Sequence, residues 1–233
     1  MHNFALLSNN KQISMQHSKF LSQFEPGIKN IIFDLGGVIL NIDYIRTINI
    51  FKEYGINNFD EIYNQARQTK LFDKLDKGEI TPADFRNEVR KLNPATHLTD
   101  EQIDQAWNAM LLDMPVERLD VLLALKSHYR TFLLSNTNEI HVPEFSGIVK
   151  KTIDKNDLSD FFEKAYYSNE MGMRKPNTDI YQFVLDKHGL AAYETLFIDD
   201  TIQNIEGAQK AGLHAYHLTN GETIDILFAD VVS

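Results

Sequence analysis

The stretch Lys29-Asn-Ile-Ile-Phe-Asp-Leu-Gly-Gly-Val38 decides the fold of this 233-residue chain. Its apolar residues Ile31–Phe33 are typical of a short buried β-strand, and the run ends at the carboxylate of Asp34. Gly36 and Gly37 follow and predict a tight turn. The carboxyl end of a buried strand is where α/β sheets commonly place binding and catalytic groups, so Asp34 is the first candidate for chemistry.

Similar apolar runs recur along the chain and predict the strands of a parallel sheet. They are Ile31–Phe33, Phe132–Leu134, Ala165–Tyr167, Leu196–Ile198 and Ala215–Leu218. Between them, apolar residues recur at helical spacing in Leu119–Leu125, Pro176–Leu185 and Ile202–Ala208. Strands that alternate with helices predict an α/β fold, a doubly wound parallel sheet with right-handed crossovers.

The long segment between the first two predicted strands shows helical patterns only. The tetrapeptides Thr81-Pro-Ala-Asp84 and Thr99-Asp-Glu-Gln102 have the residues that favour helix starts. We therefore predict a helical cap domain over residues 45–118, inserted into a core made of residues 29–44 and 119–233. Residues 1–28 are expected to be an N-terminal extension.

The composition excludes several classes of function. A net charge of −10 disfavours non-specific binding to nucleic acid, which depends on basic surface. The sequence contains no run of about 18 apolar residues, so we expect no membrane span. Cysteine is absent, so no disulfide, thiol nucleophile or cysteine metal site is expected, which fits a cytoplasmic protein. The sequence gives no indication of the oligomeric state.

Polar clusters follow four of the predicted strands, and parallel strands bring them to one edge of the sheet. The clusters are Asp34, Ser135-Asn136-Thr137-Asn138, Arg174-Lys175-Pro176 and Asp199-Asp200. Three carboxylates that remain ionised together require a cation, and oxygen ligands without nearby His or Cys favour Mg²⁺. A hydroxyl, an amide and an ammonium group in the same place suit a phosphate, which a neighbouring carboxylate can attack.

Four motifs in this order resemble the haloacid dehalogenase superfamily, in the branch with a helical cap after the first motif. The motifs are FDLGGVI (33–39), LLSNTN (133–138), RKP (174–176) and FIDDTIQNIEGAQKAG (197–212). Within that superfamily, the chain looks most similar to small sugar-phosphate phosphatases, some of which have a DLG motif. The resemblance implies a Mg²⁺-dependent phosphatase with a Rossmann-like core, acting on a small phosphorylated metabolite.

The resemblance also implies a role for each matching residue. Asp34 is the expected nucleophile and a Mg²⁺ ligand, and Lys175 neutralises the charge on the nucleophile and the phosphate. The remaining expected roles are phosphoryl binding by Ser135 and Asn136, metal binding by Asp199, Asp200 and the backbone carbonyl of Gly36, and orientation of the paired acids by Asn204.

Gly36 departs from the pattern of most phosphatases of this superfamily, which have an Asp at that position. That acid protonates the leaving oxygen and then activates water. Its absence predicts slow hydrolysis of esters with poor leaving groups, since general acid–base catalysis contributes roughly 10² to 10⁴-fold. Asp43, on the linker into the predicted cap, is the candidate substitute.

Two other functions are compatible with a missing general acid. A 2-haloacid dehalogenase lacks that acid as well, but it needs no metal and typically lacks paired acids like Asp199-Asp200. A non-catalytic protein that binds a phosphate ester for regulation is the other alternative. A phosphomutase is disfavoured, because it also needs the residue that is absent.

The remaining conspicuous side chains have structural explanations. We expect Asp73, Lys74, Asp76 and Lys77 to form a solvated face. Trp107, Tyr63 and Phe72 are expected to pack the cap, with Phe72 also a candidate for the substrate pocket. His214 and His217 lack the spacing of a metal pair on a strand and are expected to be structural or exposed.

Overall fold

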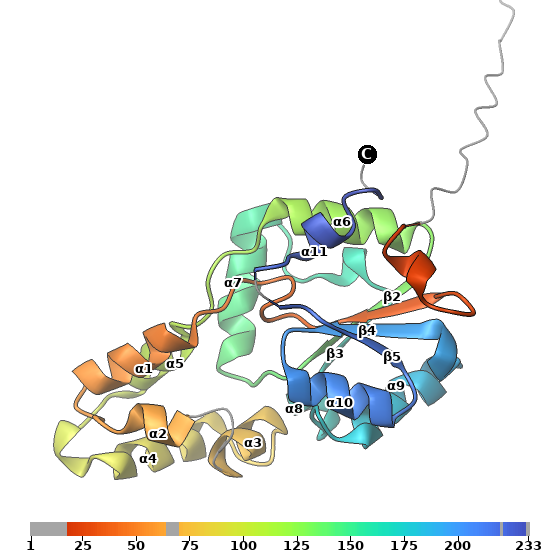
Figure 1. The fold of residues 1–233 in the computed structure, drawn as a ribbon. Helices are drawn as coiled ribbons and strands as arrows, with labels where there is room; N and C mark the ends of the chain where they lie inside the picture. Colours follow the sequence, from red (N-terminus) through yellow and green to blue (C-terminus); the bar gives the residue numbers. More distant parts are fainter. Residues whose placement is uncertain (1–17, 64–69, 220, 232–233) are drawn as a thin grey trace, which may run out of the picture.

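A computed structural model describes residues 18–63, 70–219 and 221–231. Its centre is a 5-stranded sheet with the strand order β3-β2-β1-β4-β5 (Figure 1). The strands are β1 (Asn30–Phe33), β2 (Arg130–Ser135), β3 (Lys164–Tyr167), β4 (Thr195–Asp199) and β5 (His214–His217). All neighbouring pairs are parallel, so the predicted fold class is confirmed.

Successive side chains along a strand point to opposite faces of the sheet and pack in different apolar clusters. Ile31 and Phe33 belong to one apolar cluster, whereas Ile32 belongs to another. The first cluster contains residues from α6 (Val116–Lys126), α7 (His141–Ile153) and α11 (Ile224–Leu227), and the second contains residues from α9 (Thr178–His188) and α10 (Ile202–Lys210). The helices therefore cover both faces of the sheet (Figure 1), as a doubly wound fold requires.

A set of helices between β1 and β2 has its own apolar core beside the sheet domain (Figure 1). The helices are α1 (Tyr44–Glu53), α2 (Phe59–Tyr63), α3 (Lys70–Asp76), α4 (Pro82–Leu92) and α5 (Asp100–Asn108). We call α1 to α5 the helical insertion. Thr81 and Thr99 form capping boxes with Asp84 and Gln102, at the helix starts that the sequence predicts.

The shorter elements complete the chain. They are η1 (Leu21–Gln23), η3 (Pro94–Thr96), η4 (Ser159–Phe161), α8 (Ser168–Met171) and η5 (Ala192–Glu194). Helix α6 begins at Val116, inside the predicted cap segment, and its buried Leu119 packs in the core of the sheet domain. No helix within the described residues is long and apolar enough to span a membrane.

The described part of the predicted N-terminal extension lies against the core. Leu21 is buried in the first apolar cluster, and the ring of Phe20 packs edge-on against Tyr216 and Phe228. The backbone N–H of Lys19 donates to the Asp230 carboxylate at 2.6 Å. Residues 18–28 are thus part of the packed fold, while residues 1–17 lie outside the described residues.

The strand order places β1 beside β4, although β2 and β3 come between them in the chain. The chain leaves β1 toward one side of the sheet and returns to β4 on the other side. The carboxyl ends of two such strands border a crevice, which is the usual ligand site of an open α/β sheet.

Candidate active site

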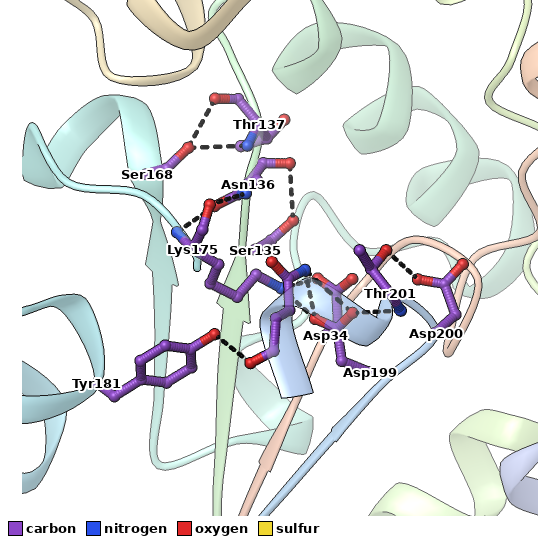
Figure 2. Close-up of polar contacts among 11 residues, drawn as sticks. Asp34, Ser135, Asn136, Thr137, Ser168, Lys175, Tyr181, Asp199, Asp200 and Thr201 are labelled. Carbon is purple, nitrogen blue, oxygen red and sulfur yellow. Dashed lines mark hydrogen bonds and ion pairs between the residues drawn. The ribbon is translucent and has the colours of Figure 1, made fainter. Parts of the chain in front are cut away.

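Asp34 and Asp199 lie side by side at the carboxyl ends of β1 and β4. The register pairs Phe33 with Ile198, and the backbone N–H of Asp34 donates to the Ile198 carbonyl at 3.0 Å. Ser135 ends β2 on the other side of β1. Parallel pairing therefore brings three of the predicted site residues to one edge of the sheet (Figure 2).

A lysine lies between two of the carboxylates. The Nζ atom of Lys175 is 2.7 Å from Asp34 Oδ1 and 2.7 Å from Asp199 Oδ2. Lys175 and Asp199 have no exposed surface, and Asp34 is 8% exposed. Carboxylate oxygens of Asp34, Asp199 and Asp200 lie within 4.8 Å of one another. The predicted residues thus form one compact, buried and charged cluster.

The charges within this cluster influence one another. Burial raises the pKa of Asp34 to about 8, with Lys175 opposing that shift and Asp199 and Asp200 adding to it. Burial lowers the pKa of Lys175, but the two carboxylates outweigh it, and the net shift is upward. The lysine is therefore held as a cation. Burial and, after it, the charge of Asp199 raise the pKa of Asp200. The cluster therefore has more carboxylates than one lysine can neutralise.

Asp199 is fixed by hydrogen bonds to both of its carboxylate oxygens. Asn204 Nδ2 lies 3.0 Å from each oxygen, and the backbone N–H of Thr201 donates to Oδ1 at 2.8 Å. Tyr181 in turn donates to the backbone carbonyl of Asn204 at 2.8 Å (Figure 2). Among the described residues, the Asp200 carboxylate has one side-chain partner, the Thr201 hydroxyl at 3.2 Å. Asp200 therefore has more capacity left for a ligand.

Ser135 and Asn136 differ in how far their side chains are already engaged. The Asn136 amide donates to the backbone carbonyl of Lys175 at 3.0 Å and accepts from its N–H at 3.0 Å. The Asn136 side chain thus bonds both the carbonyl and the N–H of the Lys175 backbone. Within the part of the chain that the structure describes, the Ser135 hydroxyl makes one long contact of 3.5 Å with the Asn136 carbonyl, which leaves it available to a ligand.

The two glycines after Asp34 have close neighbours. Gly37 has a φ of +73°, and a Cβ there would lie 2.1 Å from Asp200 Oδ2, so only glycine lets Asp200 approach the turn. A Cβ on Gly36 would lie 2.3 Å from the terminal methyl of Ile42. Ile42 therefore covers the position from which the usual second acid would extend.

A cavity of about 370 Å³ opens onto the cluster and extends toward the helical insertion. Its volume is at the small end of the range for ligand pockets. The sheet domain contributes the residues at its base, including Asp34, Ser135, Lys175 and Asp200. The helical insertion contributes Tyr44, Phe72, Asp76 and Trp107, and Met110 lines the cavity just after α5. The cavity thus lies between the two parts of the chain.

The prediction that Asp43 replaces the missing acid is wrong in this structure. Asp43 is the N-cap of α1, where its side chain accepts from the Ile45 N–H at 3.0 Å, and it also lies 3.8 Å from Arg46. It does not line the cavity. Its carboxylate satisfies an open helix end instead.

The prediction of a solvated face on α3 is wrong for two of its residues. Asp73 and Asp76 both contact the guanidinium of Arg174, and Asn138 Nδ2 donates to Asp76 at 3.2 Å. Lys74 is exposed as expected, and Lys77 pairs with Glu79. The error arose because tertiary partners distant in sequence cannot be read from a local charge pattern.

The aromatic residues and the last two histidines agree largely with expectation. Phe72 and Trp107 are buried and stacked in the helical insertion, and both line the cavity. The side chain of Tyr63 lies outside the described residues. His214 and His217 bond to backbone carbonyls of Tyr193 and Asp200, each at 3.0 Å, so both are structural.

Sequence reasoning assigned no role to several residues of the cavity. Arg174 was part of the RKP motif, so its position after a strand end was a usable signal. Asn138, which holds the cavity residue Asp76, was part of the LLSNTN motif. His141 stacks on Trp107 with ring centroids 5.1 Å apart. It carried no recognisable pattern in the sequence.

Comparisons with known proteins agree with this geometry. Residues 28–212 match the model of the haloacid dehalogenase-like hydrolases. A D-ribitol-5-phosphate phosphatase from Bacteroides thetaiotaomicron is 33% identical over 199 residues, covering 83% of this chain and 93% of that protein.

Solved structures support the same placement. A haloacid dehalogenase family enzyme from Bacteroides thetaiotaomicron, in complex with magnesium and inorganic phosphate, is 40% identical with a TM-score of 0.77, covering 87% of this chain and all of that chain. An L-2-haloacid dehalogenase from Xanthobacter autotrophicus is 18% identical with a TM-score of 0.53, covering 82% of this chain and 77% of that one, and shows likeness of fold alone. The buried strand-end cluster, the fold and the family match together establish that this chain belongs to the haloacid dehalogenase-like hydrolases.

Proposed function

We propose that this protein is a Mg²⁺-dependent phosphatase that hydrolyses a small phosphorylated metabolite, of the sugar-phosphate or sugar-alcohol-phosphate class, through an aspartyl-phosphate on Asp34. The observation that carries the proposal is the buried contact of Lys175 with both Asp34 and Asp199 at the base of a cavity. The similarity to a D-ribitol-5-phosphate phosphatase supports the substrate class.

The donor set fits a hard divalent cation. Three carboxylates and one ammonium group have a net charge of two negative units when all are ionised, which a divalent ion neutralises. All the side-chain donors are oxygens, as Mg²⁺ prefers. We propose Asp34, Asp200 and the Gly36 carbonyl as its protein ligands. Asp199 would contribute mainly negative charge near the ion rather than a direct ligand, since its oxygens already accept hydrogen bonds. When bound, the ion would polarise the phosphoryl oxygens.

The proposed reaction has two halves. An oxygen of Asp34 attacks phosphorus, a phosphorus–oxygen bond forms, and the bond from phosphorus to the leaving oxygen breaks. The leaving oxygen takes a proton and departs as an alcohol. Water then attacks the aspartyl-phosphate, inorganic phosphate leaves, and the Asp34 carboxylate is regenerated.

The other residues have proposed roles that follow from their contacts. Lys175 holds Asp34 in position and offsets the negative charge of the phosphoryl group. Ser135 donates its free hydroxyl to that group. Asn136 positions Lys175 through the lysine backbone, which revises the phosphate-binding role first expected for its side chain. Asn204 orients Asp199.

None of the residues with proposed roles supplies a proton to the leaving oxygen. Gly36 has no acid to offer, Ile42 covers the space beside it, and Asp43 caps a helix. We therefore propose that esters with poor leaving groups are hydrolysed slowly, with water as the proton donor.

The helical insertion is proposed to act as the cap over residues 45–118, apart from the start of α6 at Val116. Its residues form the upper part of the cavity, opposite the cluster. A cover of this kind excludes water from the phosphoryl group and carries the residues that contact the leaving group.

The test is a phosphate-release screen over a panel of phosphorylated metabolites with Mg²⁺, repeated with Asp34→Asn. We expect the wild-type protein to release phosphate from sugar or sugar-alcohol phosphates, with loss on chelation of the metal and in the variant. Folded wild-type protein that releases no phosphate from any ester would overturn the proposal.

The alternatives predict different results. A dehalogenase would release halide from 2-haloacids without Mg²⁺, but paired acids at the end of β4 are not needed for that chemistry. A regulatory binding protein would bind phosphate esters tightly without turnover. No feature of the described residues favours either alternative over hydrolysis of a phosphate ester.

A further inference from the structure

We propose that Asp76 and Arg174 form a selectivity pair that accepts an uncharged, hydroxyl-rich leaving group and disfavours an anionic one. This inference rests on the proposed phosphatase function and assigns the other end of its substrate. The pair joins the two parts of the chain, because Asp76 ends α3 of the helical insertion and Arg174 directly precedes Lys175 in the sheet domain. Both residues line the cavity.

The pair is held in place by several neighbours. Asp76 Oδ1 accepts from Asn138 at 3.2 Å, and the Ser168 hydroxyl lies 2.5 Å from the backbone carbonyl of Asp76. Arg174 Nη2 lies 3.4 Å from Asp76 Oδ2, and its Nη1 pairs with Asp73. A position fixed from both sides is what a specificity residue needs, since its groups are then oriented before the ligand arrives.

The pair retains hydrogen-bonding capacity. Arg174 is only 8% exposed, and its Nε–H has no hydrogen-bond partner among the described residues. That nitrogen is enclosed by protein. The contacts with Asp73 and Asp76 engage two of the five N–H donors of the guanidinium, so the part of Arg174 that lines the cavity can still donate to a ligand oxygen. Asp76 has 15% of its side-chain surface exposed, and a carboxylate accepts more than the two contacts seen here. Together they offer one donor and one acceptor, which matches a hydroxyl group.

The position within the cavity suits the leaving group rather than the phosphoryl group. Burial raises the pKa of Tyr44, and the carboxylates of Asp200, Asp34 and Asp199, followed by that of Asp76, raise it further. The Tyr44 hydroxyl is thus within electrostatic range of both the nucleophile cluster and Asp76. Asp34 lies at the sheet-domain end of the cavity, whereas Asp76 ends α3 and lines the part formed by the helical insertion, so a phosphate bound at Asp34 would leave the rest of a small substrate toward the pair.

The local charge sets the direction of selectivity. Two carboxylates, Asp73 and Asp76, face one guanidinium, so the group has a net charge of one negative unit when all are ionised. A leaving group with its own carboxylate would be repelled by this negative charge and would find no unpaired positive charge to attract it. A neutral polyol would meet no such repulsion.

A merely structural reading is that the pair fastens the helical insertion to the sheet domain. Loss of a fastener would weaken turnover of every substrate alike, whereas loss of a selectivity pair changes the ratio between substrates. The test is therefore the ratio of kcat/KM for ribitol 5-phosphate to kcat/KM for 2-phosphoglycolate, measured with Mg²⁺ in the full chain.

In Asp76→Asn, we expect this ratio to fall about tenfold or more, as for loss of a hydrogen bond to a charged group. Phosphoglycolate turnover should stay level or rise. Arg174→Lys keeps the charge but loses the guanidinium geometry and should also lower the ratio. The matched control is Arg86→Gln, which removes a bidentate pair with Asp104 at 2.7 and 2.8 Å that lies away from the cavity lining. It should leave the ratio unchanged.

The outcomes separate the two levels of inference. A wild-type enzyme that hydrolyses these esters, with an equal loss for both in Asp76→Asn and Arg174→Lys, would refute the selectivity role and leave the phosphatase function intact. Folded wild-type protein without activity on any ester would overturn both. Far-ultraviolet circular dichroism identifies a variant that fails to fold, and the other variant of the pair then decides the outcome.

Discussion

The Nζ atom of Lys175 lies 2.7 Å from Oδ1 of Asp34, with no part of the lysine exposed to solvent. The same nitrogen contacts Asp199, so one cation lies between two buried carboxyl groups. The contact matters for both stability and chemistry, because the lysine that would support phosphoryl transfer also lowers the energetic cost of burying the carboxyl groups.

Lys175→Met should therefore destabilise the protein strongly. Removing one partner of a buried ion pair costs about 3 to 5 kcal/mol, since the remaining charges are left uncompensated. Urea denaturation without metal would measure this loss. Lys126→Met is a matched control, because Lys126 is exposed and its contacts among the described residues are with the backbone carbonyls of Asp160 and Phe162. A control variant as destabilised as Lys175→Met would contradict the explanation.

Mg²⁺ should restore more stability to Lys175→Met than to the wild-type protein. The variant keeps three carboxylates but has lost their ammonium partner, so a divalent ion neutralises more unbalanced charge. A ligand that binds the folded state raises the unfolding free energy in proportion to the logarithm of its concentration over Kd. Thermal unfolding with and without Mg²⁺ would show a larger rise in Tm for the variant. An absence of any Mg²⁺ effect in either protein would count against the metal site.

Gly36→Asp should raise the turnover of alkyl phosphates only when space is made for it. The new Cβ would lie 2.3 Å from the Ile42 terminal methyl, so the single variant requires that side chain to move. In Gly36→Asp with Ile42→Ala, a general acid becomes available, and the gain should approach the 10² to 10⁴-fold range. The measurement is kcat/KM for an alkyl phosphate relative to p-nitrophenyl phosphate, whose leaving group needs little protonation.

Ile42→Ala alone is the control for that experiment, because it opens the space without supplying an acid. If the double variant matched this control on every ester, the absence of an acid at Gly36 would not be what limits the enzyme.

The sheet and the base of the site could be predicted from the sequence because their signals are local. A buried strand is a short apolar run, and its carboxyl end is marked by the polar residue that follows. Asp34, Ser135 and Asp199 each end such a run, and parallel pairing then requires them to meet. The contact of Asn204 with Asp199 was expected only from the family resemblance, which implied that Asn204 orients the paired acids.

The upper part of the cavity could not be predicted in the same way. Whether Asp76 faces solvent or Arg174 depends on how the helical insertion docks, and no local pattern encodes that. Asp43 failed for a related reason, because an acid before a helix serves as a cap as readily as a catalyst. The contact of the Asn136 side chain with the Lys175 backbone joins segments that are distant in sequence, so no local pattern encodes it.

His141 should make the protein less stable in mild acid. Burial lowers its pKa to about 3 from an ordinary value near 6.5, and its Nδ1 lies 2.7 Å from Asn108 Oδ1. Between these pH values the unfolded chain binds a proton that the folded protein does not. The unfolding free energy therefore falls as the pH drops below 6.5, by about 1.4 kcal/mol per unit.

The difference between the wild-type protein and His141→Gln isolates this effect, because buried carboxyls such as Asp34 and Asp76, with pKa values raised mainly by burial, act in the opposite direction. Urea denaturation at pH 7 and pH 5 should show that the wild-type protein loses about 2 kcal/mol relative to the variant. His128→Gln alters an exposed histidine and serves as the control. Parallel stability profiles for the wild-type protein and His141→Gln would refute the prediction.

Two glycines in helices should respond in opposite ways to the same substitution. Replacing a glycine inside a helix by alanine normally stabilises a protein by about 0.5 to 1 kcal/mol, because the unfolded chain loses conformational freedom. Gly147 in α7 has open space around the new methyl group, with no atom within 4 Å, so Gly147→Ala should show this gain. It provides the reference value for the second glycine.

Gly207 in α10 lies against the loop that carries Lys175. A Cβ there would lie 2.2 Å from the backbone carbonyl oxygen of Pro176, the residue after the lysine. A backbone atom cannot rotate away as a side chain does, so the helix or the loop must shift, at a cost of about 1 to 3 kcal/mol. Gly207→Ala should therefore lower both the urea midpoint and phosphatase turnover, because the shift displaces the lysine that holds Asp34. A gain in stability equal to that of Gly147→Ala would mean that the close approach of α10 to Pro176 does not constrain the site.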